Sequence, residues 1–309
     1  MSHGTADVVE RARFIDYFGD LGRHPQLVDG GVWYETGPGF MQRFPFHEVV
    51  PLSSTPGQGL FRTRRVQAAR FGRQPAVEDA PSSSLWIRRR PYSIDDLSAN
   101  TRSKVRRGLK RTRIERVDFS ELRTAAIDLL ASTAERQGVS YRDRDAKRWS
   151  QFCDVAPRHN MIEAWAGYVD DQLAIFAVCF EVENCFQIST VRSDSALLNH
   201  YPNNALVHTL MTEADKRDSV DTVCYGLASL DRSTSGLNDF KLRAGFEAEP
   251  IDDVILARQP FASARVLGRG LSRVEARSHR WAQAATVARS VAWWKSDEKR
   301  VARMSGAAS

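Results

Sequence analysis

The apolar and polar positions of this chain follow clear helical and strand spacings from residue 93 onward. A helix is predicted over 93–111, because Asp95 and Asp96 favour a first helical turn and apolar residues then recur on one side. A second helix is predicted over 121–136, capped by Ser120. The other predicted elements are a strand at 114–118, a helix at 143–155, strands at 162–169, 172–182 and 185–191, a helix beginning at Pro202, a strand at 222–226, a helix at 237–244 and a strand at 254–257.

From residue 114 onward the order of these elements is β-α-α-β-β-β-α-β-α-β, and this order determines the expected fold class. It is neither a regular βαβ alternation nor an all-β pattern. It therefore predicts an α/β (α+β) fold, in which a mixed sheet is flanked by helices on both faces.

The two ends of the chain differ from this central part. Residues 262–309 predict an amphipathic helical tail, with Leu and Trp on one side and Arg on the other. The expected domains are therefore 1–95, 96–261 and 262–309. Residues 1–95 contain frequent Gly and Pro, which favour turns, and predict only short elements. These are a helix at 8–18, short strands or loops at 32–35, 44–51 and 60–68, and a strand at 82–88.

Composition and charge narrow the class of protein. Hydrophobic residues make up 42% and charged residues 27% of the 309 residues, which excludes a disordered chain, a collagen-like repeat and a disulfide-rich miniprotein. The net charge of +6 is uneven, since 262–309 holds ten basic and three acidic residues and 88–116 holds eleven basic and three acidic residues. These two segments indicate local binding of anions, such as phosphate groups or an anionic membrane surface.

The cysteines and the chain ends indicate a reduced, cytoplasmic protein without a metal site. The four Cys form no C-x-x-C motif, and no His lies at zinc-finger spacing from them. The N-terminal residues lack the apolar core of a secretory signal, and no apolar run approaches the ~20 residues of a membrane span.

Four segments within 90–257 resemble the Fem-type and CelD-like branch of the GNAT superfamily of N-acyltransferases. The basic segment 97–110 resembles the basic helix of this branch, and 224–227 matches a strand that ends in an aromatic residue and Gly. Residues 237–246 resemble its L-x-x-F-K-x-x-x-G-F signature. The fourth segment resembles the helix start that replaces the usual pyrophosphate loop, and consists of Tyr201, Pro202, Asn203, Asn204 and Ala205.

The resemblance implies a GNAT-like acyltransferase domain, preceded over 1–95 by a degenerate GNAT-like domain. It implies transfer of an acetyl or longer acyl group from acyl-CoA to an amine on a small molecule, a sugar or a cell-envelope precursor. The segment 200–205 departs from the usual Gly-containing loop that binds the pyrophosphate of acetyl-CoA. A helix N-terminus with Asn side chains still attracts an anion. The donor therefore stays open between acyl-CoA and aminoacyl-tRNA, which the Fem enzymes use.

The resemblance also assigns candidate roles to individual residues. Lys241 is expected in the substrate cleft, to stabilise an oxyanion or bind a phosphate, and Tyr225 to protonate the leaving group. Residues 201–205 are the candidate donor site. Arg102, Arg106 and Arg192 are candidate phosphate-binding residues, because guanidinium groups match phosphate oxygens.

Simpler interpretations remain open for each of these candidates. Arg102, Arg106 and Lys110 recur at a spacing of four residues and are also explained as a solvated helix face. Tyr225 is also explained as a core residue. Trp33 and Tyr34 precede the acidic residue Glu35 and are candidates to contact the acceptor. The alternative is that they belong to a strand with one of the two rings packed in a core. Asp239 and Glu181 are candidates for a general base, without a feature that chooses between them.

Two other functions compete with catalysis by acyl-CoA. One is an aminoacyl-tRNA-dependent, Fem-like transferase. The other is a non-catalytic GNAT-fold binding protein, held at the inner face of a membrane by the tail 262–309, whose Arg and Trp suit an anionic interface. Nucleic acids other than tRNA rank last as partners, because no motif that reads DNA or RNA is present.

Overall fold

The described residues form two compact units in the computed structural model. The structure describes residues 3–77, 81–136, 141, 143–228 and 235–258. Unit 1 comprises Met1–Gly22 and Ser84–Glu249, and unit 2 comprises Arg23–Ser83 and Pro250–Ser309. Each unit is thus built from two separate segments of the chain, whereas each predicted domain is one continuous segment. The predicted domain boundaries 1–95, 96–261 and 262–309 stay a prediction. The tail 262–309 lies outside the described residues.

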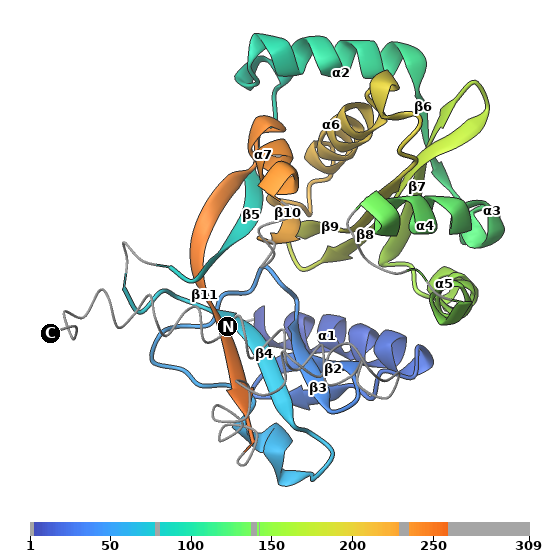
Figure 1. Cartoon of the computed structure of the whole chain (residues 1–309). Helices are drawn as coiled ribbons and strands as arrows, with labels where there is room; N and C mark the ends of the chain where they lie inside the picture. The colour runs from blue at the N-terminus through green and yellow to red at the C-terminus, as the bar shows by residue number, and fades with distance from the viewer. Residues whose placement is uncertain (1–2, 78–80, 137–140, 142, 229–234, 259–309) are drawn as a thin grey trace, which may run out of the picture. The chain divides into compact units, whose positions relative to one another are not determined.

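Unit 1 contains a six-stranded mixed sheet with the order β5-β10-β9-β8-β7-β6 (Figure 1). Only β9 and β10 are parallel, and the other neighbouring strands are antiparallel. Its elements are α1 (His3–Asp20), β5 (Ser83–Arg89), α2 (Ala99–Arg111), β6 (Arg113–Val117), α3 (Phe119–Ala125), α4 (Ile127–Arg136), α5 (Asp143–Val155), β7 (Ile162–Val169), β8 (Gln172–Val182), β9 (Cys185–Ser193), α6 (Pro202–Asp215), β10 (Thr222–Leu227) and α7 (Ser235–Arg243).

Helices cover both faces of this sheet. Alternate residues of β8 point to opposite faces. Ile175 and Ala177 join the core cluster that contains Leu206 and Leu210 of α6. Phe176, between them, contacts Trp149 of α5 with ring centroids 5.0 Å apart. The α5 face is thus distinct from the α6 face. The mixed sheet with helices on both faces confirms the predicted fold class.

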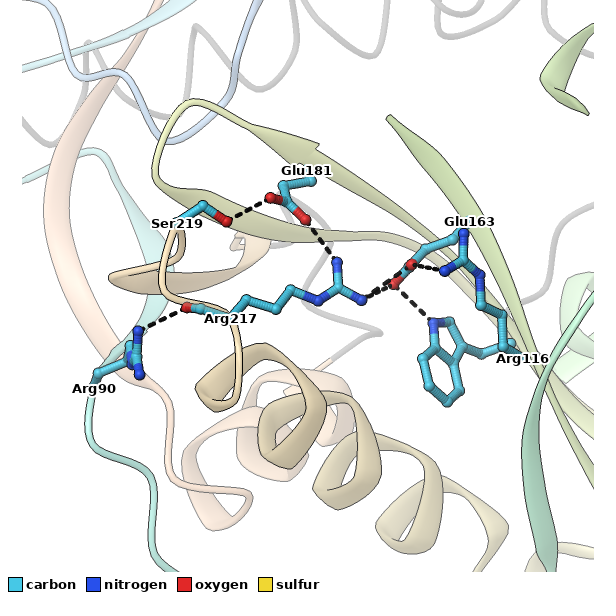
Figure 2. Close-up of polar contacts among 7 residues, drawn as sticks. Arg90, Arg116, Glu163, Glu181, Arg217 and Ser219 are labelled. Carbon is cyan, nitrogen blue, oxygen red and sulfur yellow. Dashed lines mark hydrogen bonds and ion pairs between the residues drawn. The ribbon is translucent and has the colours of Figure 1, made fainter. Parts of the chain in front are cut away.

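A buried ion-pair cluster fixes the carboxyl end of α6 to the sheet (Figure 2). Glu163 of β7 is 6% exposed and accepts hydrogen bonds from Arg217 (2.8 Å) and from the Trp165 indole (2.9 Å). Arg217 also donates to Glu181 of β8 at 2.7 Å, and Arg116 lies 3.4 Å from Glu163. Glu181, a candidate general base from the sequence, therefore belongs to this structural cluster.

Unit 2 is a five-stranded sheet with the order β1-β2-β3-β4-β11. Its core contains Trp33, Leu60 and Phe71. The pair β3–β4 is parallel and the other pairs are antiparallel. Its strands are β1 (Gln26–Val28), β2 (Gly31–Gly37), β3 (Phe40–Phe44), β4 (Ala68–Arg73) and β11 (Glu247–Ala257), which enters the unit at Pro250.

Several predicted elements differ from the observed ones. The helix expected over 93–111 is a 3₁₀ turn followed by α2, because Ser93 and Ser98 each cap a separate element. The helix expected over 121–136 is interrupted at Ala126. The segments 44–51 and 60–68, expected as short strands or loops, are not strands. The strand β3 ends at Phe44, before Pro45, which has no N–H to donate, and β4 begins only at Ala68.

Candidate functional site

The parallel strands β9 and β10 separate at their carboxyl ends. Their pairing runs from Cys185 and Thr222 to Gln187 and Cys224, and no later pair occurs in the part of these strands that the structure describes. We call residues 188–193 and 225–227 the β9–β10 edge. The helix α6 connects the two strands, so its N-terminus lies at this end of the sheet, where open α/β sheets bind ligands.

Two β-bulges accompany the separation. In β9, Ile188 pairs with Cys179 and Thr190 with Val178, so Ser189 is the extra residue, and it is exposed. In β10, the extra residue lies at Gly226, whose φ of 70° is a left-handed conformation that suits Gly. Both strands therefore bend at the edge.

The edge directs backbone groups of β9 away from β8. The Thr133 hydroxyl accepts from Ser193 N–H, and donates to Ser193 C=O, at 3.1 Å in both cases. Because an antiparallel ladder alternates in direction, Val191 directs its N–H and C=O to the same edge. Its C=O accepts a 2.8 Å hydrogen bond from Arg192. The Val191 N–H is thus placed to polarise a ligand carbonyl.

Lys241 is buried beneath the β10 side of the edge. Its side chain is 4% exposed, and Nζ donates to the carbonyl oxygens of Tyr225 (2.7 Å) and Leu227 (3.4 Å). Burial lowers the pKa of Lys241 to about 8. The ammonium group therefore holds α7 against the end of β10, and it lies 4.7 Å from the centroid of the Tyr225 ring.

Tyr225 is 9% exposed and packs against Phe246 with ring centroids 5.4 Å apart. Burial raises the pKa of its hydroxyl, while the positive charge of Arg192 opposes the rise. Tyr225 is therefore a neutral acid at the edge. The structure places Lys241, Tyr225 and Arg192, all singled out from the sequence, at one end of the sheet.

The candidate donor site begins α6. Tyr201 has a left-handed conformation with φ 60° and caps the helix, and Pro202 follows at the first helical position. The Tyr201 C=O accepts from the N–H groups of Asn204 (3.1 Å) and Ala205 (3.2 Å). Asn203 Oδ1 is buried without a hydrogen-bond partner among the described residues.

Helix α2 lies directly against this helix start. A Cβ on Gly108 would lie 2.6 Å from the Tyr201 carbonyl oxygen, so only Gly allows the observed approach. The guanidinium of Arg107 lies 4.6 Å from the centroid of the Tyr201 ring. The basic helix and the candidate donor site are therefore one packed structure.

The two phosphate-binding candidates on α2 have different surroundings. Arg102 donates to the backbone carbonyls of Leu97 (2.6 Å) and Asp95 (3.1 Å), so it holds the segment that precedes the helix. Arg106 is exposed. The basic residues of α2 form no ion pair within the described chain. They are Arg102, Lys104, Arg106, Arg107, Lys110 and Arg111.

Sequence reasoning missed two residues at the edge. Gln187, the last β9 residue paired with β10, is 0% exposed, and neither atom of its amide has a described hydrogen-bond partner. Arg136, at the end of α4, donates to Ser193 and Ser195 beside Arg192. No motif marks either residue, because the bulge and the end of α4 bring them to the edge.

The acceptor candidates Trp33 and Tyr34 lie in unit 2. Trp33 is 0% exposed, donates to Val28 C=O at 3.2 Å and packs in the core of that unit. Burial raises the pKa of Tyr34 to about 12, opposed by the charges of Arg23 and Arg70. The Trp33 ring thus has the packing of a core residue.

Comparisons with known proteins identify the fold. FemX superimposes with a TM-score of 0.52 at 14% identity, over 77% of this chain and 87% of that one. The chain therefore shares the mixed α/β fold of FemX. L-PGS from Bacillus licheniformis superimposes with a TM-score of 0.51 at 10% identity, over 90% of this chain and 95% of that one. No family model and no curated protein sequence matches the chain.

Within the described ranges, no three His, Cys, Asp or Glu side chains gather as a metal would require. None of the helices described there combines the length and the apolar character of a bilayer span.

Proposed function

We propose that this protein is an acyltransferase that moves an acyl group from acyl-CoA to an amine on a small molecule, a sugar or a cell-envelope precursor. The observation that carries the proposal is the β9–β10 edge, where two bulged parallel strands separate at the N-terminus of α6. The GNAT-like fold supports a transferase of this kind, as do the superpositions with FemX and L-PGS.

The geometry gives each group a task in the transfer. The amine attacks the thioester carbon, the new C–N bond forms, and the C–S bond breaks to release a thiol. The Val191 N–H polarises the carbonyl oxygen as negative charge develops on it. Tyr225, neutral because it is buried, donates a proton to the leaving sulfur, and its phenolate then takes up the proton that the attacking nitrogen loses as the amide forms. The N-terminus of α6 attracts the pyrophosphate.

A titration with acetyl-CoA and longer acyl-CoAs tests the proposal. We expect Asn204→Asp to weaken acyl-CoA binding about tenfold or more, because a carboxylate there repels the pyrophosphate. The same substitution favours a helix N-terminus, so loss of folding does not explain the result. Asn204→Ala is the neutral control. Acyl-CoA that binds neither wild type nor Asn204→Ala would refute this donor.

A second donor, aminoacyl-tRNA, is favoured by one observation. The basic residues of α2 have no ion pairs in the described chain, and α2 packs on the Tyr201 end of α6. Basic side chains that are already paired with carboxylates have their charge compensated. Basic side chains without such partners on an exposed helix face attract a polyanion. The fold shared with FemX is consistent with this donor.

The two donors make different predictions for α2. If tRNA is the donor, Arg106→Glu with Lys110→Glu weakens tRNA binding strongly, and the wild-type affinity falls steeply with salt. If acyl-CoA is the donor, its affinity changes little in the double variant, since Arg106 and Lys110 lie on the exposed face.

A further inference from the structure

Arg192 lies on the α5 face of β9 and has no acidic partner among the described residues. The register pairs Arg192 with Phe176, whose ring contacts Trp149 of α5, so the two side chains share that face. Its guanidinium donates to the neighbouring Val191 C=O at 2.8 Å. The ion pairs among described residues include none for Arg192, and burial lowers its pKa.

Arg136 adds a second positive charge from the last turn of α4. It donates to Ser193 Oγ (3.1 Å), Ser193 C=O (3.4 Å) and Ser195 Oγ (2.9 Å), which are all neutral oxygens. Burial lowers the pKa of Arg136, and the Arg136 charge lowers that of Arg192. We call Arg136 and Arg192 the arginine pair.

Within the part of the chain that the structure describes, no carboxylate contacts this positive charge directly. Asp194 raises the pKa of Arg136, but its oxygens accept from Gln172 (3.4 Å) and Ala196 N–H (2.9 Å). Tyr225 is neutral. Three other arginines of low exposure do have a carboxylate within 3 Å, namely Arg43 with Glu48, Arg70 with Asp253 and Arg217 with Glu163.

We propose that the arginine pair binds an oxyanion group, a carboxylate or a phosphate, of the acceptor substrate. Two like charges at a partly buried site repel each other, and an anion between them removes that cost. Guanidinium groups match the planar oxygens of a carboxylate and the oxygens of a phosphate. Arg192 is adjacent in sequence to Val191, so an acceptor held there has its amine near the reacting carbonyl. This inference rests on the proposed function, because it names the class of acceptor.

Calorimetric titration of the full chain without any acyl donor tests the pair directly. The probes are matched amines, phosphoethanolamine against ethanolamine and glycine against methylamine. We expect one anionic probe to bind about ten to a hundred times more tightly than its neutral partner. A preference for phosphoethanolamine over ethanolamine identifies phosphate as the recognised group, and a preference for glycine over methylamine identifies carboxylate.

Variants locate the preference. Arg192→Gln is expected to abolish it, Arg136→Gln to reduce it, and Arg192→Lys to retain part of it, because Lys keeps the charge and loses the fork. Arg123→Gln, an exposed change on α3, is the matched control and should retain it fully. If Arg192→Gln does not fold, Arg192→Lys and Arg136→Gln give the same comparison.

Some outcomes overturn the proposal. The proposal is wrong if the anionic and the neutral amine of each probe pair bind equally, or if neither anionic probe binds detectably. It is also wrong if the preference is unchanged in the Arg192 and Arg136 variants. Failure of the proposed function is separable, since it appears as absent acyl-CoA binding while the anion preference persists.

Discussion

The ammonium group of Lys241 donates a 2.7 Å hydrogen bond to the backbone carbonyl of Tyr225, one residue beyond the last pair between β9 and β10. A side chain of α7 thus satisfies a carbonyl of a bulged strand end. Lys241 therefore acts on the shape of the β9–β10 edge through the backbone, besides any effect of its charge on a ligand.

Lys241→Ala is expected to lower the free energy of unfolding by about 1–3 kcal/mol, because it leaves buried carbonyl groups unsatisfied. We also expect acyl transfer to fall by about two orders of magnitude, because the end of β10 that carries Tyr225 loses its anchor and a small displacement of a reacting group costs that much. Urea denaturation and transfer assays measure the two effects. Arg243→Ala, an exposed change on the same helix, is the control. Unchanged stability would contradict the anchoring role.

The stability contribution of Lys241 is expected to depend on alkaline pH. Its pKa is about 8 in the folded protein against 10.5 normally, so between these values the unfolded chain binds more protons. The free energy of unfolding of wild type, relative to Lys241→Met, should therefore rise with pH across this window, by at most about 1.4 kcal/mol per pH unit. Below pH 8 the difference should be constant. A difference that falls across the window contradicts the lowered pKa.

Gly108→Ala is expected to destabilise the protein, although Ala is the better helix former by about 1 kcal/mol. The added Cβ would lie 2.6 Å from the Tyr201 carbonyl oxygen, so α2 must move away from the start of α6. We expect a lower melting temperature and a higher KM for the donor. Ser103→Ala, on the exposed side of α2, is the control. A stabilised Gly108→Ala variant would show that the two helices are not held in this contact.

Glu163→Ala is expected to cost about 3 kcal/mol of stability, because it removes the buried carboxylate between Arg217 and Arg116. Asp154→Ala breaks the exposed pair with Arg123 and should cost no more than about 1 kcal/mol. Chemical denaturation of both variants gives the comparison. Similar costs for the two would show that the cluster in Figure 2 is no stronger than a surface pair.

Local signals were sufficient for most elements of unit 1. The apolar runs of β7 and β8 and the Pro202 start of α6 are features of adjacent residues, and the structure has them where the sequence predicts them. The break between η2 (Ile94–Asp96) and α2 was missed, because Ser98 lies inside a continuous helical pattern and its capping is seen only in its hydrogen bond. The strands of residues 23–83 were harder, since short strands are stabilised mainly by partners distant in sequence.

The sequence by itself determined the fold class, the order of elements, and the candidates Lys241, Tyr225 and Arg192, because apolar periodicity and short motifs are local properties. Only the tertiary structure decided that Lys241 is buried against β10 carbonyls and that Trp33 lies in a core. It alone brought Arg136 into contact with Ser193, the neighbour of Arg192 in β9. Burial and the neighbourhood of charges depend on strand register, on bulges and on helix packing, which join residues far apart in the chain and leave no local signature.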